Sequence, residues 1–140
     1  MNSDNRLTHA ERLRGEIRVN KLFLSGESFI AYPYRIVYAV SKAGENEESP
    51  RAALLVSVPK KRFKRAVKRN RLRRCIKEAY RLNKALLHDS LQQLGLRVEL
   101  AVVYLDKEVQ PYNVLEKHMK EMLQKLAAKV AKATEEASNV

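Results

Sequence analysis

RAALLVSVPKKRFKRAVKRNRLRRCIKEAYRLN, residues 51–83, contains the two neighbouring elements that decide the fold. Residues 51–58 are rich in alanine, leucine and valine, which predicts a buried strand that Pro59 ends. From Lys64 to Asn83 the apolar residues recur every three or four positions, which predicts a helix with one face packed on a sheet. The predicted apolar face consists of Leu72, Cys75, Ile76, Ala79 and Leu82.

The positive charge of the chain is concentrated in the same stretch. Between Arg51 and Lys77 there are 12 basic and no acidic residues, which leaves 16 of the 28 basic residues to balance all 16 acidic ones elsewhere. Like charges three and four positions apart destabilise a helix, so this pattern favours a bound polyanion such as a phosphate backbone. A basic helix at a membrane surface is the main alternative, but the small side chains on the apolar face suit packing on a sheet better.

The remaining sequence predicts an α+β fold, an α/β sandwich with a sheet of three or four strands and helices on one side. We expect a single domain over residues 1–140 with flexible ends at 1–8 and 133–140. Further strands are expected at Ser28–Ala31, Tyr34–Val40 and Arg97–Leu105, and further helices over residues 9–25 and from Tyr112 or Asn113 onward.

Two predictions concern the connections between these elements. The strands at 34–40 and 51–58 are expected to pair as a hairpin across the polar loop 41–50. Residues 84–96 are expected to form a connection with a break at Gly95. In the last helix, we expect the apolar residues Leu115, Met119, Met122, Leu123, Leu126 and Val130 to face the core.

Cysteine usage and hydropathy narrow the class of protein further. Cys75 is the only cysteine, so no disulfide can form within the chain, and a small core residue on the apolar helix face is the simplest interpretation. We find no apolar signal region at the start and no run long enough to span a bilayer. A cytoplasmic protein that is monomeric apart from its polyanion partner is therefore expected.

Residues that would make the chain a nuclease by itself are not apparent. Protein nucleases usually hold a metal on clustered carboxylates or use a histidine pair. His9, His88 and His118 fall in three different predicted elements, and four glycines form no phosphate-cradling motif. We expect no catalytic residue, no metal site and no cofactor bound by the protein alone.

Three segments of the chain together resemble a known family. VSVPKK at 56–61, AVKRNRLRR at 66–74 and KEAYRLN at 77–83 are similar to the signature of the bacterial ribonuclease P protein subunit. Upstream, ERLR at 11–14 and LFLSGESF at 22–29 are similar to the first helix of that family and the turn after it. The basic motif is highly specific, and the flanking segments are colinear with it.

The resemblance implies a fold, a partner and a function. It implies a four-stranded sheet with an unusual left-handed βαβ crossover, where the general rule expects a right-handed one. It implies binding to the catalytic RNA of ribonuclease P and to precursor tRNA, whose 5′ leader is removed endonucleolytically with the catalytic centre in the RNA. Magnesium is expected in the RNA-containing holoenzyme. Charge and resemblance together predict an RNA-binding surface of Lys60, Lys61, Lys64, Arg65, Lys68, Arg69, Asn70, Arg71, Arg73, Arg74 and Lys77.

The resemblance also implies a cleft between the sheet and the first helix that holds the single-stranded leader. Phe23 matches one aromatic position of the family, and Tyr34 and Ile36 fall on the strand whose residues face that cleft. Val19 departs from the pattern, because many members have a second aromatic residue there.

Another class of function remains open from the sequence. A stand-alone RNA-binding module, such as a ribosomal protein or an RNA chaperone on a similar scaffold, would also have a basic helix and no catalytic cluster. Binding to DNA is less consistent with the pattern, because neither a helix-turn-helix nor a dimer spacing is apparent.

Overall fold

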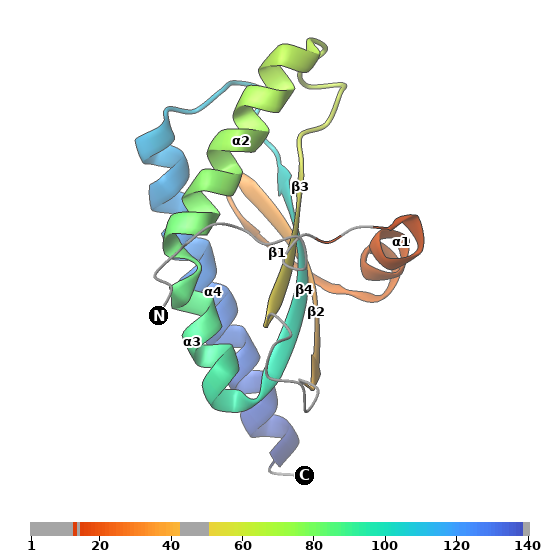
Figure 1. The fold of residues 1–140 in the computed structure, drawn as a ribbon, viewed down its shortest axis with the longest axis vertical. Coiled ribbons are helices and arrows are strands. Elements are labelled where there is room, and N and C mark those ends of the chain that lie inside the picture. The colour runs from red at the N-terminus through yellow and green to blue at the C-terminus, as the bar shows by residue number, and fades with distance from the viewer. Residues whose placement is uncertain (1–12, 14, 43–50, 139–140) are drawn as a thin grey trace, which may run out of the picture.

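The structure, a computed structural model, describes residues 13, 15–42 and 51–138. It contains four helices and four strands within these residues (Figure 1). In chain order they are α1 (Glu16–Ser25), β1 (Glu27–Ala31), β2 (Tyr34–Lys42), β3 (Ala52–Ser57), α2 (Ala66–Asn83), α3 (Ala85–Leu94), β4 (Leu96–Tyr104) and α4 (Tyr112–Ser138).

The four strands form one mixed sheet in the order β1-β2-β4-β3. β4 pairs antiparallel with β2 and parallel with β3, so β2 and β3 are not neighbours. The predicted hairpin between these two strands is therefore wrong. The reason lies in β4, whose side chains are buried or half-buried along its whole length, because an apolar strand of this kind is stable only in the middle of a sheet.

Helices cover both faces of the sheet (Figure 1). α2, α3 and α4 pack on one face over a large core that includes Leu72, Leu100 and Met119. α1 packs on the opposite face over a small core in which Leu22 contacts Val37 and Ala101. The prediction of helices on one side is correct for α2–α4 and wrong for α1.

Side chains of β2 alternate between these two faces, as the pleat of a strand requires. Tyr34 and Ile36 belong to the large core beneath α2–α4 and are fully buried. Val37 belongs to the small core under α1, and Arg35, which lies on the same face of the strand as Val37, is exposed. Only residues on the Val37 side of β2 can therefore meet a ligand on the α1 face.

α3 occupies most of the stretch that we predicted to be a connection, so that prediction is wrong. Leu87 and Leu91 are spaced by one helical turn and are fully buried in the large core, which stabilises the short helix. The predicted break at Gly95 is confirmed, because this residue ends α3 in the left-handed conformation with φ of 66°.

The two long helices have the faces that their periodicity predicts, with one exception. In α2, Leu72, Ile76 and Ala79 are buried, but Leu82 is 46% exposed because it lies at the edge of the contact with the core. All six predicted core residues of α4 are buried. α4 continues to Ser138, while the predicted flexibility of 133–140 remains a prediction and residues 1–8 lie outside the described residues.

The turn after α1 depends on a close approach of two backbone segments. Gly26 ends the helix, and its N–H donates a hydrogen bond to the carbonyl of Leu22 at 2.8 Å. A Cβ at this position would lie 2.6 Å from that carbonyl oxygen and 2.9 Å from the carbonyl oxygen of Tyr38. Only glycine therefore allows the chain to pass from α1 into β1 at this distance.

Candidate RNA-binding surface

The segment between β3 and α2 is anchored by one buried aromatic side chain. Phe63 is 4% exposed, and its ring centroid lies 6.0 Å from that of Tyr104 in the core. The Nζ atom of Lys68, one turn into α2, lies 5.6 Å from the centroid of the Phe63 ring. Around this anchor the cationic side chains face solvent: Lys60, Lys61, Arg62, Lys64 and Arg65.

The side chain of Arg69 in α2 holds this preceding segment by intramolecular hydrogen bonds. Its Nη1 atom donates hydrogen bonds to the carbonyl oxygens of Phe63 and Lys64, both at 2.8 Å. The side chain is only half-buried, so the contacts are accessible at the surface. The sequence predicts RNA contact for this residue, whereas its position indicates that it holds the preceding turn in place.

Two further residues of the predicted surface interact with each other. Arg73 Nη1 donates a hydrogen bond of 2.8 Å to Asn70 Oδ1, which fixes the guanidinium group over the outer side of α2. Asn70, Arg71 and Arg74 are exposed, while Lys77 is half-buried. The structure thus places the predicted basic residues in the turn before α2 and along the helix itself as far as Lys77.

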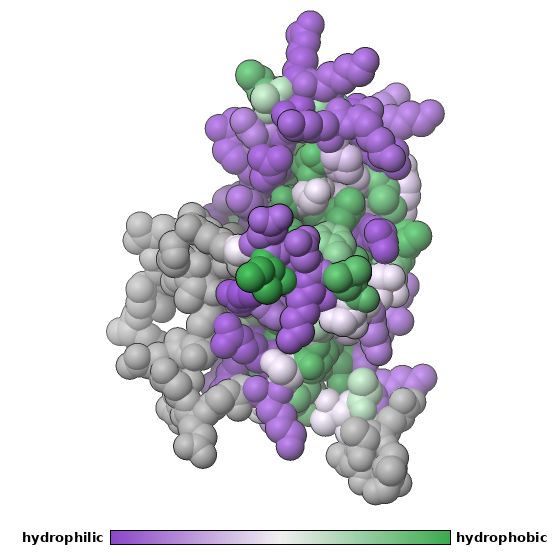
Figure 2. Space-filling view, turned by 90° about the vertical axis from the view of Figure 1, so that its right-hand side faces the viewer, coloured by the Kyte–Doolittle hydropathy of each residue, from purple (hydrophilic) through white to green (hydrophobic). Residues whose placement is uncertain are grey.

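The electrostatics of this end of α2 are unfavourable without a ligand. The first turn of the helix contains no acidic residue, although negative charge is preferred where the helix dipole is positive. Figure 2 shows the hydrophilic side chains that project from the end of the molecule where β3 passes into α2 (top). An anion bound there would stabilise both the dipole and the clustered cations.

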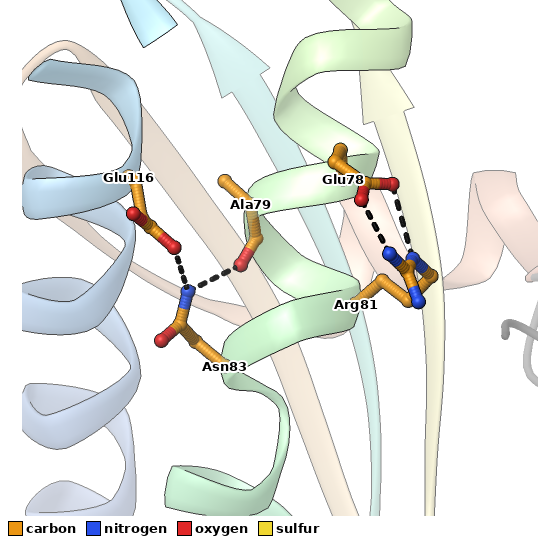
Figure 3. A network of polar contacts seen from close by, with 5 residues as sticks. All are labelled: Glu78, Ala79, Arg81, Asn83 and Glu116. Atoms are coloured by element: carbon orange, nitrogen blue, oxygen red, sulfur yellow. Dashed lines mark hydrogen bonds and ion pairs between the residues drawn. The ribbon is translucent and has the colours of Figure 1, made fainter. Parts of the chain in front are cut away.

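The only acid on α2 is paired with a neighbouring cation (Figure 3). Arg81 donates hydrogen bonds to both carboxylate oxygens of Glu78, which holds the pKa of this carboxyl below its ordinary value. At the opposite end of α2, Asn83 Nδ2 donates to the carbonyl of Ala79 at 2.8 Å and to Glu116 of α4 at 3.0 Å. These contacts fix α2 against α4 and do not reduce the charge at its start.

On the opposite face of the sheet, one flank of α1 is held to β4 by an ion pair, and the other flank carries a partly exposed aromatic side chain. Arg18 forms an ion pair with Glu99 of β4, with 3.1 Å between Nε and Oε2. Val19 packs against the small core, so this position contributes to packing. Phe23 is 40% exposed and lies on the flank of α1 that faces away from Arg18.

The structure does not place the three predicted cleft residues together. Tyr34 and Ile36 lie on the face of β2 opposite α1, and the Tyr34 hydroxyl donates a 2.8 Å hydrogen bond to the carbonyl of Leu115 in α4. This burial argues against direct leader contact at these two positions. The β2 residues that do face α1 are Arg35, Val37 and Ala39. Alternation along the predicted strand groups these residues on one face but does not tell which face α1 covers.

The two histidines that the structure describes, His88 and His118, have different partners. The Nε2 atom of His88 is hydrogen-bonded to the hydroxyl of Tyr80 at 3.1 Å, and His118 Nδ1 lies 3.4 Å from Glu121. His9 lies outside the described residues. Over 13, 15–42 and 51–138, no group of three His, Cys, Asp or Glu side chains could hold a metal ion. In the same ranges no helix has the length and apolarity to cross a membrane.

These features together define a class of protein. The chain is a small α+β domain with a localised cationic surface at the start of one helix, which is typical of proteins that bind nucleic acid. Residues 7–127 match the family described as ribonuclease P. The chain therefore belongs to the ribonuclease P protein family.

Individual relatives agree with this assignment. A ribonuclease P protein component of Porphyromonas gingivalis is 40% identical over 89% of this chain and 88% of its own length. The ribonuclease P protein component of Chlorobium phaeobacteroides is 33% identical over 72% of this chain and 73% of its own length.

Solved structures share the fold. The ribonuclease P protein of Staphylococcus aureus superimposes with a TM-score of 0.60 at 19% identity, covering 84% of this chain and 94% of that one. The protein from Thermotoga maritima gives a TM-score of 0.63 at 21% identity, covering 82% of this chain and 96% of that one. The left-handed sense of the β3–β4 crossover remains what the resemblance implies.

Proposed function

We propose that this chain is the protein component of a ribonuclease P ribonucleoprotein that removes the 5′ leader from precursor tRNA. The observation that carries the proposal is the position of the charge in a member of this family. Between 51 and 77 there are 12 basic and no acidic residues, most of them in the turn before α2 and along the first half of that helix. The cationic end of α2 binds the catalytic RNA, and the catalytic centre lies in that RNA.

The contribution of the protein is electrostatic and positional. A folded RNA that holds precursor tRNA brings many phosphates close together, and magnesium ions normally screen their repulsion. The side chains around Phe63 and along the outer side of α2 replace part of that screening by neutralising phosphates directly. Family membership and the unfavourable charge at the start of α2 support this function.

The single-stranded leader binds on the α1 face of the sheet. Phe23 offers an exposed ring on which a base can stack, and the exposed Arg35 on β2 offers a cation for the backbone. Stacking and backbone contacts tolerate different leader sequences, as substrates from many tRNA genes require. Mature tRNA has no leader, so this contact raises the affinity for precursor tRNA above the affinity for mature tRNA.

Reconstitution with a bacterial ribonuclease P RNA tests the proposal. At magnesium concentrations where the RNA alone cleaves precursor tRNA slowly, the added protein is expected to restore cleavage at the mature 5′ end. The protein without RNA is expected to leave the precursor intact after nuclease treatment of the preparation. A protein that binds the RNA but does not stimulate cleavage would instead be a stand-alone RNA-binding protein.

A further inference from the structure

A cavity of about 360 Å³ lies between α2 and the segment that leads into α4. Its inner wall is formed by Leu72 and Cys75 of α2, and Val109 and Tyr112 close the other side. Ligand pockets generally occupy about 300–1,000 Å³, so this cavity suits a single small group. It lies on the α2 flank that faces α4, whereas Phe23 and α1 lie across the sheet.

One polar atom in this apolar wall has no partner. The hydroxyl oxygen of Tyr112 is buried. Among the described residues, it is the one buried side-chain nitrogen or oxygen atom that has no hydrogen-bond partner. Buried polar groups in folded proteins are almost always hydrogen-bonded, so an ordered water or a bound molecule is the expected partner of this hydroxyl. A hydroxyl can both donate and accept, and it therefore suits a ligand that carries polar atoms on a flat apolar body.

Two cations lie at the same cavity. Lys68 and Arg71 are three positions apart on α2, so their side chains extend over the same flank of the helix, and both are exposed. A neutral apolar ligand would gain nothing from them. A ligand with an anionic group next to a flat, weakly polar body would contact the cations, the apolar wall and the Tyr112 hydroxyl together.

We propose that this cavity binds one unpaired nucleobase of an RNA, with the adjoining phosphate held by Lys68 and Arg71. Proteins that recognise single-stranded RNA commonly take splayed-out bases onto aromatic or guanidinium planes and hydrogen-bond their edges. The inference rests on the proposed RNA binding and adds a specific subsite to it. It assigns to this flank of α2 the recognition of a base, in addition to the attraction of phosphates.

A pair of tryptophan substitutions tests the cavity. Val109→Trp fills it from a side chain that is 41% exposed, and Leu94→Trp adds the same group to a 36% exposed position at the far end of α3. The probes are a single-stranded uridine decamer and an abasic ribose-phosphate decamer of the same charge. Fluorescence anisotropy at one salt concentration measures the affinity of each variant for both.

The expected result is a change in the preference for bases. Val109→Trp lowers the ratio of uridine-decamer to abasic-decamer affinity by about tenfold, the effect of losing one stacked base, and Leu94→Trp leaves the ratio unchanged. Equal ratios in all three proteins would contradict the binding of a base in the cavity. Salt-sensitive binding would in that case still support the proposed function. Failure of the unsubstituted protein to bind either decamer or ribonuclease P RNA would contradict both.

Cys75 provides a readout that needs no substitution, because it is the single cysteine of the chain and lines the cavity. N-ethylmaleimide should modify it in the free protein, and a saturating uridine decamer should slow that reaction while the abasic decamer does not. Unreactive Cys75 in the free protein would contradict an open cavity. Equal protection by an oligoglutamate peptide would mean that the site recognises charge alone, which would overturn the proposal.

Discussion

Arg69 and Arg74 lie on the same helix and carry the same charge, but their surroundings differ. The guanidinium group of Arg69 is hydrogen-bonded to two carbonyl oxygens of the preceding turn, whereas Arg74 is exposed on the outer side of α2. Hydrogen bonds from charged groups contribute about 1.5–3 kcal/mol when buried, and less at a half-exposed site. We therefore expect Arg69 to support RNA binding indirectly, by holding the turn, and Arg74 to contact RNA directly.

Substitution distinguishes the indirect role of Arg69 from the direct role of Arg74. Arg69→Ala is expected to lower the free energy of unfolding by about 1 kcal/mol and to accelerate amide hydrogen exchange over residues 60–65, with weaker RNA binding as a consequence. Arg74→Ala is expected to weaken RNA binding with unchanged stability and exchange. Urea titration and exchange measured by mass spectrometry check both variants. Unchanged exchange in Arg69→Ala would mean that Arg69 acts only as a phosphate ligand.

Phe23 is the residue on which the leader proposal depends. Phe23→Ala in the assembled ribonucleoprotein is expected to lower the affinity for precursor tRNA by about tenfold, the value of one stacked base, and to leave the affinity for mature tRNA unchanged. Leu24→Ala is the matched control, because Leu24 is 88% exposed on the outer side of the same helix. If both variants keep the precursor-to-mature affinity ratio of the unsubstituted protein, Phe23 has a packing role only.

At the scale of elements, local sequence pattern predicts what each segment forms better than what it contacts. The strands at β2, β3 and β4 and the core faces of α2 and α4 follow from periodicity, because a buried stripe has to recur every turn. The order of strands does not follow, since pairing is decided by which strand is apolar on both faces. The assignment of Tyr34 and Ile36 to a cleft failed for the same reason: a strand has two faces, and sequence alone did not tell which one α1 covers.

α3 illustrates how a short helix is missed and how its packing can be tested. Leu91 is fully buried, whereas Leu94, three residues later, is 36% exposed. Leu91→Ala is expected to cost about 2–5 kcal/mol of unfolding free energy and Leu94→Ala less than about 1 kcal/mol. Urea titration of both variants measures the difference. Similar losses at the two positions would mean that residues 85–94 do not pack as the helix described here.

At the scale of the whole molecule, buried tyrosines couple stability to alkaline pH. Burial raises the pKa of Tyr104 to about 12, and burial followed by the hydrogen bond with Glu27 raises that of Tyr38 to about 12, from ordinary values of 10. Groups whose pKa is raised by folding stabilise the protein fully below pH 10, and this contribution is lost as the pH rises toward 12. The unfolding free energy is expected to fall over that window, less steeply in Tyr104→Phe than in the unsubstituted protein, as urea titrations at successive pH values would measure. Equal slopes would contradict the coupling.

The position of the charge is the feature of the whole molecule on which the account depends. The net charge of +12 would attract RNA wherever it was located, but the proposed function requires it at the start of α2. Two triple variants separate position from amount. One replaces Lys60, Lys61 and Lys64 with glutamine, and the other replaces the exposed Lys117, Lys120 and Lys132 of α4, so that both proteins fall from +12 to +9.

The direct measurement is cleavage of precursor tRNA by each variant with ribonuclease P RNA at low magnesium. We predict that the variant at Lys60, Lys61 and Lys64 loses most of the stimulation given by the unsubstituted protein, and that the α4 variant retains it. Circular dichroism is the control that both variants are folded. Equal loss of stimulation in the two variants would show that total charge is sufficient, and it would contradict the assignment of the RNA-binding surface to α2.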